Sequence, residues 1–141
     1  MIHQPQNQVW AAIETSPYTG GVERIVGVIW LEGASFGPGH GQLRAFIVED
    51  HLRGLGVGRR LFEKLMDFVL EIGLEKVTLH TRRDLVSARK LYEEGGFVLQ
   101  KEEDVLKWDQ QARTMEYLWT RETAPQGGET NDDHELGIVD K

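Results

Sequence analysis

The sequence has no cysteine and no long apolar run. Without cysteine there can be no disulfide bond, no thiolate metal ligand and no cysteine nucleophile, so any catalysis must use other groups. No window approaches the roughly 18 consecutive apolar residues of a membrane-spanning helix, and residues 1–6 lack the basic patch and apolar core of a secretory signal. We therefore expect a soluble, cytoplasmic protein.

Basic residues are scarce relative to acidic ones. The chain has 16 Lys and Arg against 23 Asp and Glu, a formal net charge of -7. This charge opposes non-specific attraction to nucleic acid or to an anionic membrane, so we expect neither as a partner and favour a small or cationic one. The histidines lack a metal-binding spacing such as His-Glu-x-x-His, and we expect no metal.

The 141 residues, 40% of them hydrophobic, indicate one globular domain with a single core. We place this domain at residues 9–123, after a short lead at residues 1–8. Residues 124–141 combine Pro125, a glycine pair and several acidic residues with few large apolar ones. This composition predicts a disordered acidic tail.

The periodicity of apolar residues predicts a mixed α/β (α+β) fold. Three strands are expected first, the first two as a hairpin, at residues 9–13, 24–31 and 42–48. Apolar residues at spacings of three and four then predict a helix over residues 59–72 that ends at Gly73. A β-like run at residues 76–81 follows, and the strand, helix, strand succession predicts a right-handed parallel βαβ unit.

The second half of the chain predicts one more helix and two more strands. The helix follows Asp84, a candidate N-cap, and ends near Glu94, before a glycine pair with a permissive backbone. The strands are expected at residues 97–102 and 112–120, with a polar connection between them.

Three alternating glycines, Gly54, Gly56 and Gly58, lie between the third strand and the long helix. Such a backbone can aim several N–H groups at one point, and the helix adds the positive end of its dipole, which predicts a phosphate site. Arg53, Arg59 and Arg60 add positive charge. The spacing excludes the Rossmann fingerprint, and the absence of Gly-Lys-Ser/Thr excludes the phosphate loop of NTPases. The alternative for so short a motif is a tight turn that binds nothing.

Residues 53–58 resemble the pyrophosphate loop of the GNAT superfamily of acetyl-CoA-dependent N-acyltransferases, Arg/Gln-x-x-Gly-x-Gly/Ala. Residues 88–97 resemble the second signature of that family, Ala-x-x-Leu-Tyr-x-x-x-Gly-Phe, and the order of elements is similar from Val9 to Thr120. The run Gln42-Leu43-Arg44-x-Phe46 is also similar to the acetyltransferase half of fused MarR-type regulators.

The resemblance implies a GNAT-like mixed, mostly antiparallel sheet with a central parallel βαβ unit. It also implies an N-acetyltransferase that moves an acetyl group from acetyl-CoA to a primary amine of a small molecule or peptide. Tyr92 would be the catalytic general acid for the coenzyme A sulfur, and the Val48 N–H would polarise the thioester carbonyl. The alternative for Tyr92 is a core tyrosine whose ring packs inside the fold and whose hydroxyl is hydrogen-bonded. The cofactor-binding residues implied are Val48, Arg53, Gly54, Leu55, Gly56, Val57, Gly58 and Arg59.

The sequence departs from the family pattern in two respects. Leu85 stands where the family often has asparagine, seven places before the tyrosine. The usual first strand and first two helices, which wall the acceptor site, are lacking, so apolar sheet surface should be uncovered and a homodimer or docking partner is expected. Trp10 and Trp30 are candidates for that surface, unless both indoles lie in the core.

Several functional questions stay open in the sequence. Glu49, Asp50, His51 and His80 all lie near ends of the two central strands, and spacing does not separate them as general bases. Ordered water removes the amine proton in many relatives. An acyl-CoA-binding sensor or partner-docking module with little turnover is an alternative function, and a remnant that binds no cofactor is another.

Overall fold

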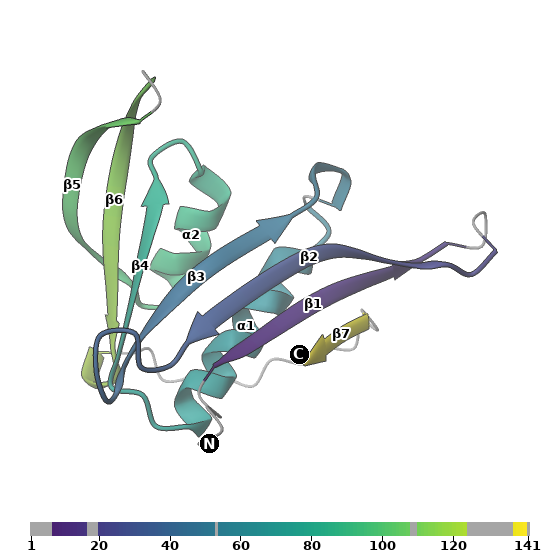
Figure 1. Ribbon diagram of the computed structural model, residues 1–141, viewed down its shortest axis with the longest axis horizontal. Helices are drawn as coiled ribbons and strands as arrows, with labels where there is room; N and C mark the ends of the chain where they lie inside the picture. The colour runs from purple at the N-terminus through teal and green to yellow at the C-terminus, as the bar shows by residue number, and fades with distance from the viewer. Residues whose placement is uncertain (1–6, 17–19, 53, 108–109, 124–136, 141) are drawn as a thin grey trace.

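The computed structural model describes residues 7–16, 20–52, 54–107, 110–123 and 137–140. Figure 1 shows how its elements are arranged. In chain order they are β1 (Gln8–Thr15), β2 (Glu23–Glu32), β3 (His40–Val48), the 3₁₀ turn η2 (Asp50–Leu52), α1 (Val57–Glu71), β4 (Lys76–Arg82), α2 (Val86–Glu94), β5 (Val98–Lys107), β6 (Gln110–Thr120), the 3₁₀ turn η3 (Arg121–Thr123) and β7 (Gly137–Asp140).

The strands form one mixed sheet in the order β5-β6-β4-β3-β2-β1-β7. The pair β3 and β4 is parallel, and the other neighbours are antiparallel. Helix α1 connects the parallel pair, so the predicted βαβ unit and the mixed, mostly antiparallel sheet are confirmed. The β1–β2 hairpin is confirmed as well.

Strand β5 is longer than the sequence predicted. The polar connection expected after residue 102 is partly strand, because residues 103–107 remain paired with β6. Arg113 of β6 bonds the carboxylates of Glu102 and Asp104 at 2.8 and 3.1 Å. These cross-strand ion pairs let a polar sequence continue the ladder.

One segment of the expected disordered tail forms a strand in the structure. Residues Gly137–Asp140 form β7, which pairs antiparallel with β1 at the edge of the sheet. An edge strand presents unpaired N–H and C=O groups, which a distant segment of the chain can satisfy. Residues 124–136 and 141 lie outside the described residues, and the domain boundaries stay a prediction.

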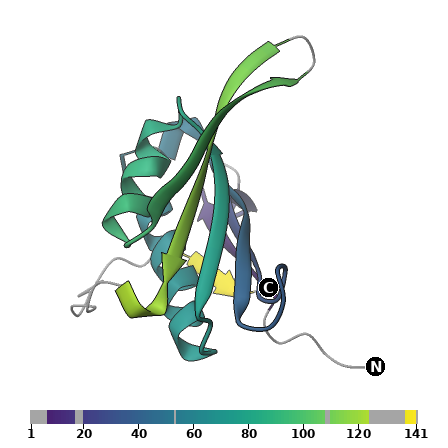
Figure 2. The same cartoon turned by 90° about the vertical axis from the view of Figure 1, so that its left-hand side faces the viewer.

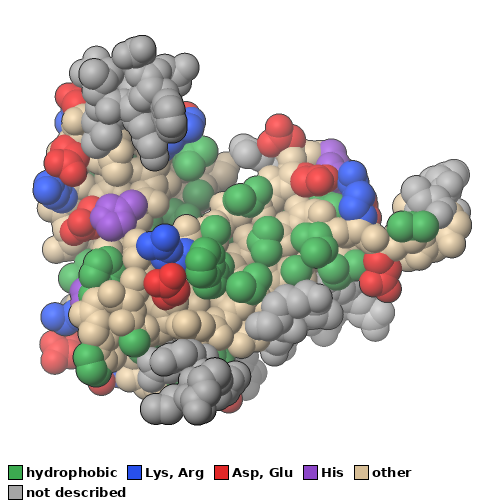
Figure 3. Space-filling model, in the orientation of Figure 1, with side chains coloured by type: hydrophobic (Ala, Val, Ile, Leu, Met, Phe, Trp, Pro, Cys, Tyr) green, Lys and Arg blue, Asp and Glu red, His purple; other side chains and the backbone are tan. Residues whose placement is uncertain are grey.

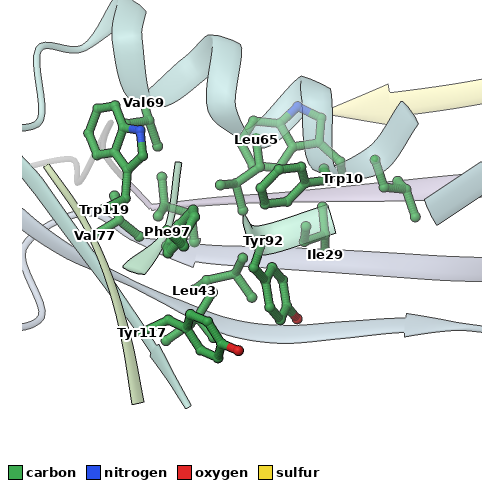
Figure 4. Close-up of a cluster of buried hydrophobic side chains, with 14 of the residues drawn as sticks. Trp10, Ile29, Leu43, Leu65, Val69, Val77, Tyr92, Phe97, Tyr117 and Trp119 are labelled. Carbon is green, nitrogen blue, oxygen red and sulfur yellow. The ribbon is translucent and has the colours of Figure 1, made fainter. Parts of the chain in front are cut away.

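Both helices pack on one face of the sheet, as Figure 2 shows. Helix α1 buries the apolar stripe that its periodicity predicts, and its buried side chains share one core with those of β1 to β4 and β6. Figure 4 shows part of this core, in which Trp10 is 2% exposed. The Trp10 ring meets Phe68 of α1 edge to face at 5.3 Å. Trp10 is therefore a core residue and not part of an uncovered surface.

The ends of the two helices bear out one prediction and correct another. Gly73, with φ 78°, ends α1 in the left-handed conformation that favours glycine. Asp84 is not the N-cap of α2; Leu85 occupies that position, and no side chain caps the helix. The Asp84 carboxylate instead binds the Arg82 guanidinium through two hydrogen bonds.

No helix of the described residues covers the opposite face of the sheet, which exposes a band of hydrophobic side chains over β1, β2 and β3 (Figure 3). Trp30 is 37% and Ile47 62% exposed. Strand alternation places on the same face the partly buried Val9, Val28 and Ala45, and also Ala11, which is 2% exposed. We call this set the open apolar face; it consists of Val9, Ala11, Val28, Trp30, Ala45 and Ile47.

Candidate active site

The two parallel strands separate partway along their length. β3 pairs with β4 from His40 to Leu43, opposite Lys76 to Leu79. Beyond that point β3 stays paired with β2 as far as Val48, and β4 stays paired with β6 as far as Arg82. Figure 1 shows the two strands diverging, and we call the opening between them the fork.

The backbone of β3 offers a donor at the fork. The Glu49 N–H donates to the Val26 carbonyl of β2 at 2.9 Å. Because successive N–H groups of a strand point to opposite sides, the Val48 N–H points away from β2 and toward the fork. The side chain of Val48 packs against the core on the helix side of the sheet.

The glycine turn forms the start of α1 beside the fork. Gly54 and Gly56 both have φ 82°, the left-handed conformation, and Gly56 is the N-cap of the helix without a side-chain cap. The Arg60 N–H donates to the Gly56 carbonyl at 3.1 Å, so the preceding N–H groups of the first turn have no acceptor within the helix. The first turn contains no acidic residue. These N–H groups, which lack an acceptor within the helix, and the helix dipole suit an anion.

Gly58 has a different role from the two left-handed glycines. A Cβ on Gly58 would lie 3.4 Å from Phe46 Cζ, 3.7 Å from Val48 Cγ2 and 3.8 Å from Leu91 Cδ1. These are ordinary van der Waals distances, so the start of α1 packs against the end of β3 and against α2 with room for a Cβ at this position. This close packing places the glycine turn at the fork.

The other residues expected to bind the cofactor differ in what they expose. Arg53 lies outside the described residues. Leu55 is exposed, whereas the Val57 side chain is buried in the core. Val57 could therefore contact a cofactor only through its backbone N–H. Arg59 forms an exposed ion pair with Glu94 of α2 at 2.9 Å. Exposed pairs of this kind are weak, and a phosphate could compete for the guanidinium.

Tyr92 is 4% exposed and lies in an aromatic cluster. Its ring centroid lies between 5.8 and 6.2 Å from those of four other rings, Phe46, Phe62, Phe97 and Tyr117. Burial raises the pKa of the Tyr92 phenol well above its ordinary value. The phenol therefore keeps its proton at neutral pH.

Sequence reasoning missed a second buried tyrosine beside Tyr92. The Tyr117 hydroxyl of β6 donates to Glu93 at 2.7 Å and accepts from Arg89 Nε at 3.3 Å, both on α2. Loss of solvent raises the pKa of the Tyr117 phenol. Figure 4 shows the two tyrosine hydroxyls on the same side of the cluster. Alternation with Met115 and Trp119 along β6 was the available signal for its burial.

The candidate general bases fall into two groups. His51 lies 3.3 Å from Glu49 and 3.5 Å from Glu14, and Arg24 bonds the same Glu49 carboxylate at 3.0 Å. Asp50 is exposed in η2, next to this cluster in sequence.

His80 lies apart from that cluster. It directly follows the last residue of β4 that pairs with β3, so it borders the fork. Its Nε2 lies 3.0 Å from a Glu116 carboxylate oxygen on β6.

The described part of the chain contains neither a metal-binding cluster nor a membrane-spanning helix. No group of three or more His, Asp or Glu side chains in these residues is placed to hold a metal ion. None of the helices there combines the length and apolar character needed to cross a membrane.

A mixed sheet with parallel β3 and β4 and two helices is a GNAT-like architecture. The model of the acetyltransferase (GNAT) family matches residues 2–97, a range that includes both signatures. The chain belongs to this family.

Relatives agree with this assignment. The chain is 35% identical over 77 residues to the uncharacterized N-acetyltransferase YycN of Bacillus subtilis (strain 168), and the match covers 52% of this chain and 47% of that protein. The chain thus spans about half the length of the curated relative it matches.

Solved structures share the fold at low identity. Arabidopsis thaliana NAA60 in complex with a bisubstrate analogue superposes with a TM-score of 0.69 at 17% identity, covering 82% of this chain and 75% of that one. A Bacillus anthracis str. Ames protein in complex with acetyl coenzyme A gives 0.63 at 23% identity, covering 84% and 65%.

Proposed function

We propose that this protein is an N-acetyltransferase that moves an acetyl group from acetyl-CoA to a primary amine of a small molecule or peptide. The observation that carries the proposal is the glycine turn at the start of α1, held against the fork by the packing of Gly58. An anion site and an open strand edge thus lie side by side. Family membership supports the same reaction class.

The donor set fits the diphosphate of coenzyme A. First-turn N–H groups at Gly56, Val57, Gly58 and Arg59, with the helix dipole, would hold the diphosphate oxygens without a metal. In the sequence, Arg53, Gly54 and Leu55 form the part of the glycine loop that precedes these N–H groups. Bound there, acetyl-CoA supplies a thioester as the acyl donor.

Two groups of this chain suit the transfer step. The Val48 N–H would donate to the thioester carbonyl, where negative charge develops. Tyr92, which burial keeps protonated, would give its proton to the departing sulfur.

Of the four candidate bases, we propose His80 to receive the amine proton. It borders the fork, and the Glu116 carboxylate orients its ring. Glu49 and His51 are instead held in the ion-pair cluster with Arg24.

A thiol-release assay with acetyl-CoA and a panel of polyamines, amino acids and lysine peptides tests the proposal. Release that depends on one amine class, and that falls in Tyr92→Phe, supports it. Tight binding of coenzyme A without thiol release for any amine would rule out the proposed acetyltransferase activity.

Two observations favour a second function. Leu85 leaves α2 without a side-chain cap, and the open apolar face is free of helices in the described residues. Both fit an acyl-CoA-binding sensor or partner-docking module with little turnover. The homodimer, the shortened N-terminal side and the likeness to MarR-fused acetyltransferases stay predictions.

A further inference from the structure

The open apolar face runs directly into the fork. Its side chains form two cross-strand rows, because Val9 faces Trp30 and Trp30 faces Ala45, while Ala11 faces Val28 and Val28 faces Ile47. Each row ends on β3 at a residue beyond the last pair with β4. An apolar surface therefore begins at the edge where the acyl group would be transferred.

The size of this face suits a small occupant. It comprises six side chains, two of them alanine, and the most exposed is Ile47. A stable protein interface uses roughly 20 to 30 residues and about 800 Å² on each partner. The open apolar face, with its six side chains, is by itself much smaller than such an interface.

The Trp30 indole offers a flat aromatic surface within the face. The Arg44 guanidinium lies 5.7 Å from the centroid of its ring, a cation–π contact that restrains the side chain. An aromatic ring or a branched alkyl group can lie against such an indole and the neighbouring aliphatic side chains.

The other side of the fork is polar and acidic. His80 and Glu116 are cross-strand neighbours on β4 and β6, and the Glu116 carboxylate bonds the His80 imidazole. A carboxylate at this edge attracts a protonated amine, in keeping with the net charge of -7. The fork thus joins the open apolar face, with Arg44 at its edge on β3, to a polar wall on β4 and β6 that carries the Glu116 carboxylate.

We propose that the acceptor is a small primary amine carried by a bulky apolar group, of the arylalkylamine class. Its ring lies on the open apolar face against Ile47, Val28 and Trp30, and its amine reaches the fork beside His80. Neighbouring strands are about 4.8 Å apart, so a molecule roughly 10 Å long spans from the fork to β2. This inference names the substrate class of the proposed acetyl transfer and rests on that function.

Phenethylamine and ethylamine are the matched probes, since they differ in the aromatic ring. Calorimetry on protein saturated with coenzyme A measures binding, and initial rates of thiol release with acetyl-CoA measure kcat/KM. We expect phenethylamine to exceed ethylamine by roughly 10- to 100-fold, the usual effect of burying a ring of this size. Trp30→Ala should lower the preference for phenethylamine over ethylamine about tenfold. Leu70→Ala is the control, because Leu70 is 46% exposed on α1, on the other face of the sheet.

The two measurements separate this inference from the proposed function. If ethylamine or putrescine is acetylated as efficiently as phenethylamine, or if Trp30→Ala changes nothing, the inference is overturned while the proposed acetyl transfer stands. Selective binding of phenethylamine that Trp30→Ala abolishes, without thiol release from any amine, supports the acceptor site and rejects turnover. No binding of phenethylamine overturns the inference. A dimer by sedimentation that Trp30→Ala dissociates also overturns it, because a second copy then covers the face.

Discussion

Tyr92 gains its chemical character from its surroundings. Four aromatic rings exclude water from its phenol, and this burial raises its pKa. A group with a raised pKa stays protonated over the whole range in which such an enzyme is assayed, which is the state a general acid needs. The same position in an exposed helix would leave the phenol free to ionise in mild alkali.

Replacing Tyr92 with phenylalanine should affect the chemistry and spare the cofactor. The ring keeps its packing, so we expect coenzyme A affinity to change by less than about twofold, while kcat falls about 100-fold or more, the usual share of proton transfer. Calorimetry and thiol release measure the two effects. An unchanged kcat would show that another group protonates the sulfur.

His40 makes stability depend on pH in a defined direction. Desolvation, assisted by Lys76, holds the pKa of His40 below its ordinary value of 6.5, and its Nε2 lies 2.7 Å from Thr78 Oγ1. Below pH 6.5 the unfolded chain takes up this proton before the folded one does. The free energy of unfolding should therefore fall as the pH drops from 6.5 through the depressed pKa, and level off below it.

Urea denaturation between pH 7 and pH 5 checks this expectation. His40→Gln keeps a polar partner for Thr78 and cannot titrate, so its free energy of unfolding should fall less over that range. Equal slopes in the two proteins would remove His40 as the cause.

At the scale of elements, α2 depends on few contacts. It has nine residues, one buried side chain and no side-chain cap. Tyr117 ties it to β6 through hydrogen bonds to Glu93 and Arg89, which lie one helical turn apart. The helix that carries Tyr92 is therefore positioned by a tyrosine on a strand that is adjacent to it only in space.

Tyr117→Phe should loosen α2 without emptying the core. We expect the free energy of unfolding to fall by about 2 kcal/mol, because the variant loses the hydrogen bonds to Glu93 and from Arg89. Hydrogen exchange should speed up at amides of α2 and stay unchanged in α1. Protection of α2 equal to that of the wild type would show that aromatic packing alone holds the helix.

At the scale of the whole molecule, local patterns predicted the elements and long-range pairing did not follow from them. The 3.6-residue period gave α1, and the glycine spacing gave the turn before it, because both depend on neighbours in sequence. The end of pairing between β3 and β4 after Leu43 depends on register, which no local pattern specifies. The longer β5, the pairing of β7 with β1 and the contact of Tyr117 with Glu93 were missed for the same reason.

The candidate site was predicted to a similar extent. The Gly56 turn was foreseen as a shape suited to phosphate, and the resemblance supplied Tyr92 and Val48. Sequence spacing could not decide whether His80 or Glu49 is the general base, because the partners of both residues come from other strands. Trp10 and Trp30 looked alike in sequence, and only the face of the sheet on which each lies separates them.

The central claim is that coenzyme A binds with its diphosphate at the start of α1. Gly56 and Gly73 lie at opposite ends of this helix with φ 82° and 78°, and a Cβ on either would meet nothing within 4 Å. Gly56→Asp and Gly73→Asp therefore add the same charge with the same backbone strain. At Gly56 the new carboxylate would occupy the first-turn N–H groups and repel the phosphates.

Calorimetric titration of acetyl-CoA into the wild type and these two variants tests the claim most directly. We predict that Gly73→Asp binds as the wild type does and that Gly56→Asp loses at least about tenfold in affinity, a loss of roughly 1.4 kcal/mol. Equal affinity in all three proteins, or no heat of binding in the wild type, would contradict the account.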